Sequence, residues 1–184
     1  MDRYNSHMYI LKSIVKILNP NKVLETGMGF GSTKFFVDNG IHTTSIEMQS
    51  CDWYEKVCRE IKDNGLFTSY LSLGTSGVVE IIDSLDRFDF IFVDGHGENR
   101  WEQINTSFRH TNVIVTHDTE AMVYEWQNTK LPPGWSWIDF TEVSPWTSIL
   151  TDNLEIISSL FSYKHKIYSD ISNKDYLDRR RLVK

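Results

Sequence analysis

One stretch near the N-terminus, Val23–Thr33 (VLETGMGFGST), constrains the fold of this chain most. An apolar strand is expected to run into an acidic residue, and three alternating glycines then lead to hydroxyl residues that open a helix. Glycine has no Cβ, so a ligand can approach the backbone of such a loop closely. The free N–H groups at the helix N-terminus can bind polar ligand atoms. The stretch therefore predicts a strand–loop–helix unit that binds a nucleotide-like ligand.

Strands and helices are expected to alternate over most of the chain. Five strands are expected before residue 117, namely Lys22–Thr26, His42–Glu47, Phe67–Ser72, Phe88–Asp94 and Asn112–Thr116. Such alternation favours a parallel sheet with helices on both faces. After a proline-rich break, Trp135–Val143 and Trp146–Thr151 indicate an antiparallel pair of strands. The expected fold is thus α/β, a Rossmann-like three-layer sandwich whose mostly parallel sheet of about seven strands is closed by an antiparallel hairpin.

The helices that should cover this sheet follow from apolar spacing and from stop signals. They are expected near residues 8–18, 32–39, 50–64, 75–85, 98–108 and 119–127, with another over 156–161. The 184 residues suffice for one domain with a full core. We expect a single domain over 1–184, with an N-terminal helix in 1–19, a core over 22–151 and a C-terminal extension over 152–184.

Composition excludes some partners. The net charge of −6 argues against a surface that neutralises many phosphates, so no nucleic-acid partner is expected. No apolar run approaches the ~20 residues that cross a bilayer, so no membrane partner is expected. The first residues lack the basic start and apolar centre of a signal peptide. A cytoplasmic location is the resulting expectation.

Two acidic residues flank the glycine loop and indicate the kind of ligand. Glu47 ends the second expected strand and is placed to bind the two hydroxyls of a ribose. Gly27 and Gly29 fit a dinucleotide G-x-G-x-x-G pattern, but its third position falls on Ser32. The Glu25 carboxylate would repel a pyrophosphate and attract an ammonium group. The loop therefore favours the amino-acid end of S-adenosylmethionine over a phosphate.

A second pair of acids follows the fourth and fifth expected strands. Neighbouring strands lie ~4.8 Å apart, so Asp94 and Asp118 could share one divalent cation. Oxygen ligands with an incomplete protein shell suit Mg²⁺, which could lower the pKa of a substrate hydroxyl. His96 or His117 could complete the metal site, or His96 could act as a general base without a metal.

Two motifs resemble those of known enzymes. Glu25–Thr33 resembles the first motif of class I methyltransferases, in the E-x-G-x-x-x-G-x-S/T form of catechol and caffeoyl-CoA O-methyltransferases. Val93–His96 and Val115–Thr119 are similar to the "DG-x-H … HDT" pattern of a broad bacterial and viral O-methyltransferase family, which includes relatives that act on sugars. The resemblance covers roughly Val23–Glu120.

This resemblance implies roles for particular residues. The cofactor residues that it implies are Glu25, Gly27, Gly29, Gly31, Thr33, Glu47, Met48, Thr75, Ser76 and Asp94. Among them, Met48, Thr75 and Ser76 would border the adenine, and the glycine loop would hold the methionine part. The implied catalytic residues are Asp94, His96 and Asp118. Thr119 would be a third metal ligand beside Asp94 and Asp118, but metal-dependent relatives have the stronger ligands Asn or Asp at its position.

The function expected from these features is methyl transfer from S-adenosylmethionine (EC 2.1.1 class) to a small hydroxylated molecule such as a sugar or phenol, with Mg²⁺ as a further cofactor. A nucleic-acid amino methyltransferase is disfavoured because the chain lacks a D/N-P-P-Y/F/W motif after Asp94. An NAD-dependent reductase is disfavoured by Glu25 and the glycine spacing. A non-catalytic module that keeps only the fold is a further alternative. The apolar face of the first helix leaves a homodimer open.

Overall fold

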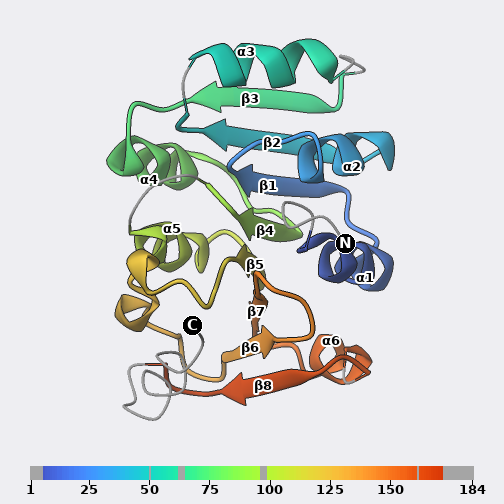
Figure 1. Cartoon of the computed structure of the whole chain (residues 1–184), viewed down its shortest axis with the longest axis vertical. Helices are drawn as coiled ribbons and strands as arrows, with labels where there is room; N and C mark the ends of the chain where they lie inside the picture. Colours follow the sequence, from blue (N-terminus) through green and yellow to red (C-terminus); the bar gives the residue numbers. More distant parts are fainter. Residues whose placement is uncertain (1–5, 50, 62–64, 96–98, 161, 172–184) are drawn as a thin grey trace.

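The computed structural model describes residues 6–49, 51–61, 65–95, 99–160 and 162–171. One eight-stranded sheet runs along the long axis of the molecule, in the order β3-β2-β1-β4-β5-β7-β6-β8 (Figure 1). The strands are β1 Lys22–Thr26, β2 His42–Glu47, β3 Phe67–Leu71, β4 Phe90–Val93, β5 Val113–His117, β6 Ser136–Phe140, β7 Thr147–Thr151 and β8 His165–Tyr168. Strands β1 to β5 are parallel, while β7 pairs antiparallel with both β5 and β6. The expected mostly parallel sheet with an antiparallel hairpin is confirmed.

The eighth strand was not expected. β8 pairs antiparallel with β6 and forms the edge of the sheet. Its His165–Tyr168 sequence is half-buried to exposed, so it lacks the apolar run that marks the inner strands. It follows α6 (Leu154–Ser159), whose N-terminus is capped by the Asn153 side chain, which accepts hydrogen bonds from the Glu155 and Ile156 N–H groups.

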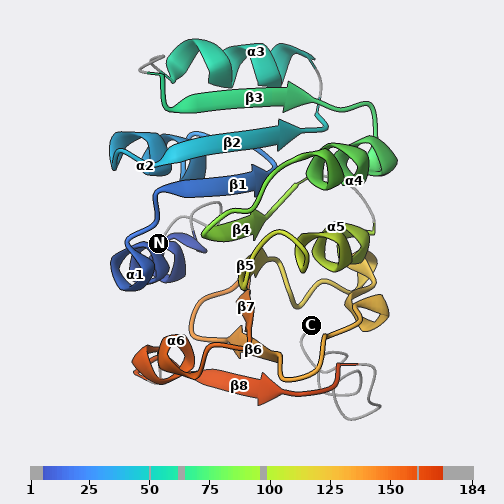
Figure 2. The same ribbon diagram turned by 180° about the vertical axis from the view of Figure 1, so that it is seen from behind.

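Helices cover both faces of the sheet, as Figures 1 and 2 show from opposite sides. The remaining α-helices are α1 Met8–Leu18, α2 Ser32–Asp38, α3 Cys51–Glu60, α4 Thr75–Ser84 and α5 Arg100–Ser107. One apolar cluster joins α1, α2 and α6 to Phe90 and Phe92 of β4, and a second joins α4 and α5 to Ile91 and Val93. Successive strand residues point to opposite faces of the sheet, so the apolar residues of β4 pack against the helices on both faces. The expected three layers are therefore present.

The expected helix over 119–127 is wrong. In its place the chain forms two short 3₁₀ turns, η2 Met122–Tyr124 and η3 Trp126–Asn128. Glu125 between them is left-handed (φ 53°), a conformation that ends a helix. Trp126 is buried in the cluster beneath α5, so tertiary packing overrides the local helical pattern.

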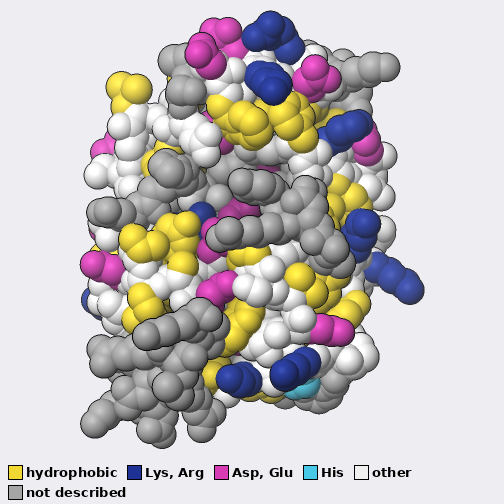
Figure 3. Space-filling view, in the orientation of Figure 1, with side chains coloured by type: hydrophobic (Ala, Val, Ile, Leu, Met, Phe, Trp, Pro, Cys, Tyr) yellow, Lys and Arg dark blue, Asp and Glu magenta, His cyan; other side chains and the backbone are white. Residues whose placement is uncertain are grey.

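The structure also shows how charged side chains are distributed on one face and how long the helices are. Among the described side chains on the face drawn in Figure 3, Lys and Arg are scattered among Asp and Glu without forming a continuous patch. In the described part of the chain, every helix falls short of the length and hydropathy that a bilayer crossing requires.

Candidate active site

A cavity of about 320 Å³ lies where β1, β2 and β4 end, on the edge where open parallel sheets bind ligands. Its volume is at the lower end of the range for small-molecule sites. The lining residues are His7, Gly27, Met28, Gly29, Phe30, Gly31, Ser32, Glu47, Gln49, Trp53 and Asp94. Among the described residues, this lining includes two carboxylates and no Lys or Arg. A larger hollow of about 660 Å³ beside η3 contains none of the predicted site residues.

Two glycines of the loop serve different purposes. Gly27 has φ +86°, and a Cβ there would lie 2.5 Å from the Gly95 Cα atom. Its N–H also donates to the Ile46 carbonyl at 2.8 Å, so the close neighbour that requires glycine at this position is the protein backbone. Gly29 lines the cavity, and a Cβ there would meet nothing within 4 Å. The prediction that the loop admits a ligand therefore applies to Gly29, whereas Gly27 is required by the fold.

Glu25 faces the interior of the loop. Its carboxylate is fully buried and accepts hydrogen bonds from the hydroxyls of Ser32, Thr33 and Ser45. Thr33 in turn accepts from the Gly29 N–H at 2.8 Å. Burial raises the pKa of Glu25 to about 7, although these three hydrogen bonds oppose the shift. Neither Glu25 nor Thr33 lines the cavity, so their contacts fix the shape of the loop.

Glu47 has the position that the sequence predicts. It is buried, it lines the cavity, and backbone N–H groups hold both of its oxygens. Oε2 accepts from Met28 at 3.1 Å, and Oε1 accepts from Met48 and Gln49 at 2.7 and 2.6 Å. A carboxylate offers about four acceptor positions, so one is left for a ligand hydroxyl. The Glu47 side chain is thus preorganised at the cavity wall.

Three residues that are predicted to border the adenine do not line this cavity, and one predicted residue is not described. Met48 packs against the core cluster beneath α4. Thr75 and Ser76 begin α4 and are half-buried and exposed, and neither lines the cavity. His96 lies outside the described residues.

Sequence reasoning missed the aromatic wall of the cavity. Trp53 and Phe30 both line it and meet edge to face at 5.3 Å between ring centroids. The Trp53 indole N–H donates to the Met28 carbonyl at 3.0 Å, which ties α3 to the glycine loop. One signal was available: α3 begins four residues after Glu47, so its first turn must lie near the same edge of the sheet.

The two acids that follow β4 and β5 are brought together, but around an arginine. Arg100 is 3% exposed, and its guanidinium lies 3.4 Å from Asp94 Oδ1 and 3.5 Å from Asp118 Oδ2. It also donates to the His117 carbonyl at 3.0 Å and stacks on the Tyr124 ring at 3.9 Å. This buried cation compensates the two carboxylates.

The expected Mg²⁺ ligand set therefore does not fit. Asp94 and Asp118 already share the Arg100 guanidinium, and Asp118 does not line the cavity. Thr119 is fully buried, and its hydroxyl accepts a hydrogen bond from Ser148 at 2.7 Å. Asp118 has the left-handed backbone conformation, with φ 57°. The expected alternation of strands and helices predicted the positions of Asp94 and Asp118 at neighbouring strand ends, but it did not predict that Arg100 lies between them.

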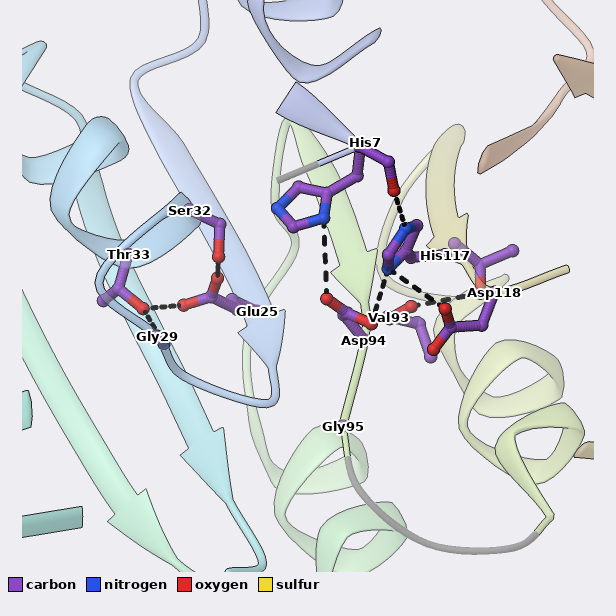
Figure 4. A network of polar contacts seen from close by, with 12 residues as sticks. His7, Glu25, Gly29, Ser32, Thr33, Val93, Asp94, Gly95, His117 and Asp118 are labelled. Carbon is purple, nitrogen blue, oxygen red and sulfur yellow. Dashed lines mark hydrogen bonds and ion pairs between the residues drawn. The ribbon is translucent and has the colours of Figure 1, made fainter. Parts of the chain in front are cut away.

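Two histidines flank Asp94, as Figure 4 shows. His117 Nδ1 lies 3.2 Å from Asp94 Oδ1 and 3.6 Å from Asp118 Oδ1, and its Nε2 hydrogen-bonds Ser6 at 2.7 Å. His7 Nδ1 lies 3.8 Å from Asp94 Oδ2. His7 is the residue immediately before α1, and no local sequence motif indicated a role for it.

These contacts shift the pKa values of the three groups in different directions. Burial lowers the pKa of His7 to about 4, against the attraction of Asp94. Burial also disfavours the charged form of His117, but the hydrogen bond and charge of Asp94, with the charge of Asp118, raise its pKa. The pKa of Asp94 is lowered because His117, Arg100 and His7 together outweigh its burial. Near neutral pH the cluster holds an ionised Asp94 beside a neutral His7.

Comparisons with known proteins support the fold. No family model matches the sequence, and no curated protein does either. An O-methyltransferase from Bacillus cereus in complex with S-adenosylhomocysteine superposes with a TM-score of 0.59, at 15% identity over 82% of each chain. The S-adenosylhomocysteine-bound methyltransferase PaMTH1 from Podospora anserina superposes with a TM-score of 0.62, at 11% identity over 82% of this chain and 79% of that chain. The chain therefore has the fold of the class I methyltransferases.

Proposed function

We propose that this protein is an enzyme that transfers a methyl group from S-adenosylmethionine to a hydroxyl oxygen of a small molecule of the sugar or phenol type. One observation carries the proposal: the cavity at the end of β1 and β2 is lined by the glycine loop and by the preorganised Glu47. The likeness in fold to an O-methyltransferase and to a second methyltransferase, both with S-adenosylhomocysteine bound, adds support.

The charge of the lining distinguishes this cofactor from a dinucleotide. Among the lining residues that the structure describes, Glu47 and Asp94 carry the charge, and both are acidic. A pyrophosphate would be repelled by them, whereas the sulfonium and ammonium groups of S-adenosylmethionine would be attracted. We assign the ribose to Glu47 and the methionine part to the loop that includes Gly29. Glu25 acts on the cofactor indirectly, through the shape of that loop.

The reaction requires that an acceptor hydroxyl lose its proton while its oxygen attacks the sulfonium methyl group in line. Positioning of the two reactants provides much of the acceleration in such a transfer. We assign to Asp94, which lines the cavity, the orientation of the acceptor hydroxyl, and to Asp118 the positioning of Asp94 through Arg100. For His96, the two predicted roles of general base and metal ligand both stay open.

Calorimetric titration with S-adenosylhomocysteine, S-adenosylmethionine and NAD tests the cofactor. We expect micromolar binding of both adenosyl compounds and none of NAD. Glu47→Gln should weaken the adenosyl compounds by roughly 10- to 100-fold, since a hydrogen bond to a charged group contributes about 1.5–3 kcal/mol. Glu80→Gln, an exposed change on α4, is the matched control and should bind as the wild type does.

Absence of adenosyl binding by the wild-type protein would refute the proposal. Once binding is established, incubation with S-adenosylmethionine and a panel of phenols and sugars, followed by detection of S-adenosylhomocysteine, identifies the acceptor class. Binding without turnover on any hydroxylated acceptor would favour the non-catalytic module.

A further inference from the structure

Three potential metal ligands from distant parts of the sequence converge beside the cavity. His7 precedes α1, Asp94 follows β4, and His117 ends β5. One ligand atom from each lies within 4.8 Å of the other two. Figure 4 shows both imidazole rings turned toward the Asp94 carboxylate from different sides.

His7 is the unusual member of this group. It is 4% exposed, and neither of its ring nitrogens has a hydrogen-bond partner among the described residues. Its nearest charged neighbour, Asp94 Oδ2, is 3.8 Å away, beyond hydrogen-bond length. An unsatisfied buried polar group costs about 1–3 kcal/mol, and native proteins rarely keep one without a reason. The His7 ring therefore indicates a missing partner.

A metal ion is a partner that such a ring can take, because a neutral imidazole nitrogen binds metals through its lone pair. The Asp94 carboxylate beside it is a second ligand of the kind that zinc-type ions accept, and its Oδ2 lies 3.8 Å from His7 Nδ1.

We propose that His7, Asp94 and His117 form a binding site for a divalent transition-metal ion of the zinc type. Two imidazole nitrogens and one carboxylate oxygen suit Zn²⁺ and its neighbours in the transition series, whereas Mg²⁺ prefers oxygen alone. Zn–N and Zn–O bonds of ~2.1 Å in a tetrahedron place ligand atoms ~3.4 Å apart. His117 Nδ1 lies 3.2 Å from Asp94 Oδ1 and His7 Nδ1 lies 3.8 Å from Asp94 Oδ2, and one ligand atom from each of the three residues lies within 4.8 Å of the others, so small side-chain shifts reach that value.

The surroundings supply the support that such a site needs. Ser6 hydrogen-bonds the outer nitrogen of His117 at 2.7 Å, the kind of contact that orients a metal-ligating histidine. With His117 neutral, as a metal ligand must be, Asp94 and Asp118 carry two negative charges against the single positive charge of Arg100, which leaves a net attraction for a cation. The metal must displace the proton that Asp94 and Asp118 favour on His117.

Three protein ligands leave a zinc ion with an open coordination position. His7 and Asp94 both line the cavity, so this position faces it. There the ion would hold an acceptor oxygen and lower the pKa of its hydroxyl group, a role that rests on the proposed function. Metal binding itself does not depend on that function.

Calorimetric titration of the chelator-treated full chain with Zn²⁺ at pH 8 tests the site. We expect one equivalent to bind the wild type, and His7→Ala and His117→Ala each to weaken this binding by at least about tenfold, since even loss of a metal-site support costs roughly 10- to 100-fold. His42→Ala, an exposed histidine at the opposite end of β2, is the matched control and should keep the wild-type affinity. Circular dichroism checks that each variant is folded, and His7→Gln and His117→Gln replace any alanine variant that is not.

No Zn²⁺ binding by the wild type would overturn the proposal, and so would variants at His7 and His117 that bind as tightly as the wild type. The same samples are titrated with S-adenosylhomocysteine. Zinc binding without adenosyl binding would uphold the metal site and refute the proposed function. Adenosyl binding without zinc binding would refute the metal site and uphold the cofactor of the proposed function.

Discussion

Replacement of Gly27 by alanine should destabilise the protein strongly, although the change adds one methyl group. At φ +86° an L-residue costs roughly 1–2 kcal/mol relative to glycine. The new Cβ would also lie 2.5 Å from the Gly95 Cα atom and 2.6 Å from the Asp94 carbonyl oxygen. Both contacts are backbone atoms, so relief requires β1 and β4 to move apart.

Overpacking of this kind typically costs about 1–3 kcal/mol. Together with the backbone conformation, the expected loss is about 2–5 kcal/mol, a large part of the ~5–15 kcal/mol that stabilises a typical domain. Equilibrium unfolding in urea measures it. With a slope of about 2 kcal/mol per molar urea, a loss of 3 kcal/mol lowers the midpoint by about 1.5 M.

Gly29→Ala is the matched control in the same loop. Nothing lies within 4 Å of a Cβ at Gly29, so stability should stay within about 1 kcal/mol of the wild type. Because Gly29 lines the cavity, this variant should instead lose affinity for S-adenosylhomocysteine. A Gly27→Ala protein that unfolds within about 0.5 kcal/mol of the wild type would refute the reasoning.

Two further changes probe the buried charges. Arg100→Met should lower the free energy of unfolding by about 3 kcal/mol, the low end for a broken buried ion pair because Asp94 and Asp118 are 20% and 27% exposed. Urea unfolding measures this loss, and Arg109→Met, which breaks the exposed pair with Asp83, should cost less than ~1 kcal/mol; equal losses would contradict the role of Arg100. The pKa of Glu25 is raised from 4.5 to about 7, so its contribution to stability is full below about pH 4.5 and is lost as pH rises through about 7. Glu25→Gln has no carboxyl group to ionise, so it does not lose this contribution. When unfolding is measured at pH 4.5, 6 and 8, the free energy of unfolding of the variant should rise relative to that of the wild type by on the order of 3 kcal/mol. A difference between the two proteins that does not change with pH would show that Glu25 titrates normally.

Local sequence pattern was enough to predict most of the sheet. The apolar run Phe90–Val93 marks a strand within four residues, and the glycine loop after Thr26 marks the residue at which β1 ends. Glu47 was also predictable, because the end of a strand that neighbours β1 must reach the same edge of the sheet. By contrast, the half-exposed β8 has little periodic signal, and the segment after Asp118 has a helical pattern that the burial of Trp126 overrides.

The direction and partners of side chains could not be predicted in this way. Glu25 has the spacing of a ligand contact, but tertiary packing surrounds its carboxylate with Ser32, Thr33 and Ser45. Asp94 and Asp118 occupy the expected strand ends, but only the packing of α5 brings Arg100 between them.

The sequence by itself determined the class of fold, the edge of the sheet that holds the cavity, and the acidic groups that belong there, because these depend on periodicity and strand order. Only the tertiary structure decided which groups share a site with them. His7 and His117 are 110 positions apart, yet their rings lie 4.7 Å apart because α1 packs across β4 and β5. No local pattern encodes that contact, since it is produced by burial of the apolar face of α1 against the sheet.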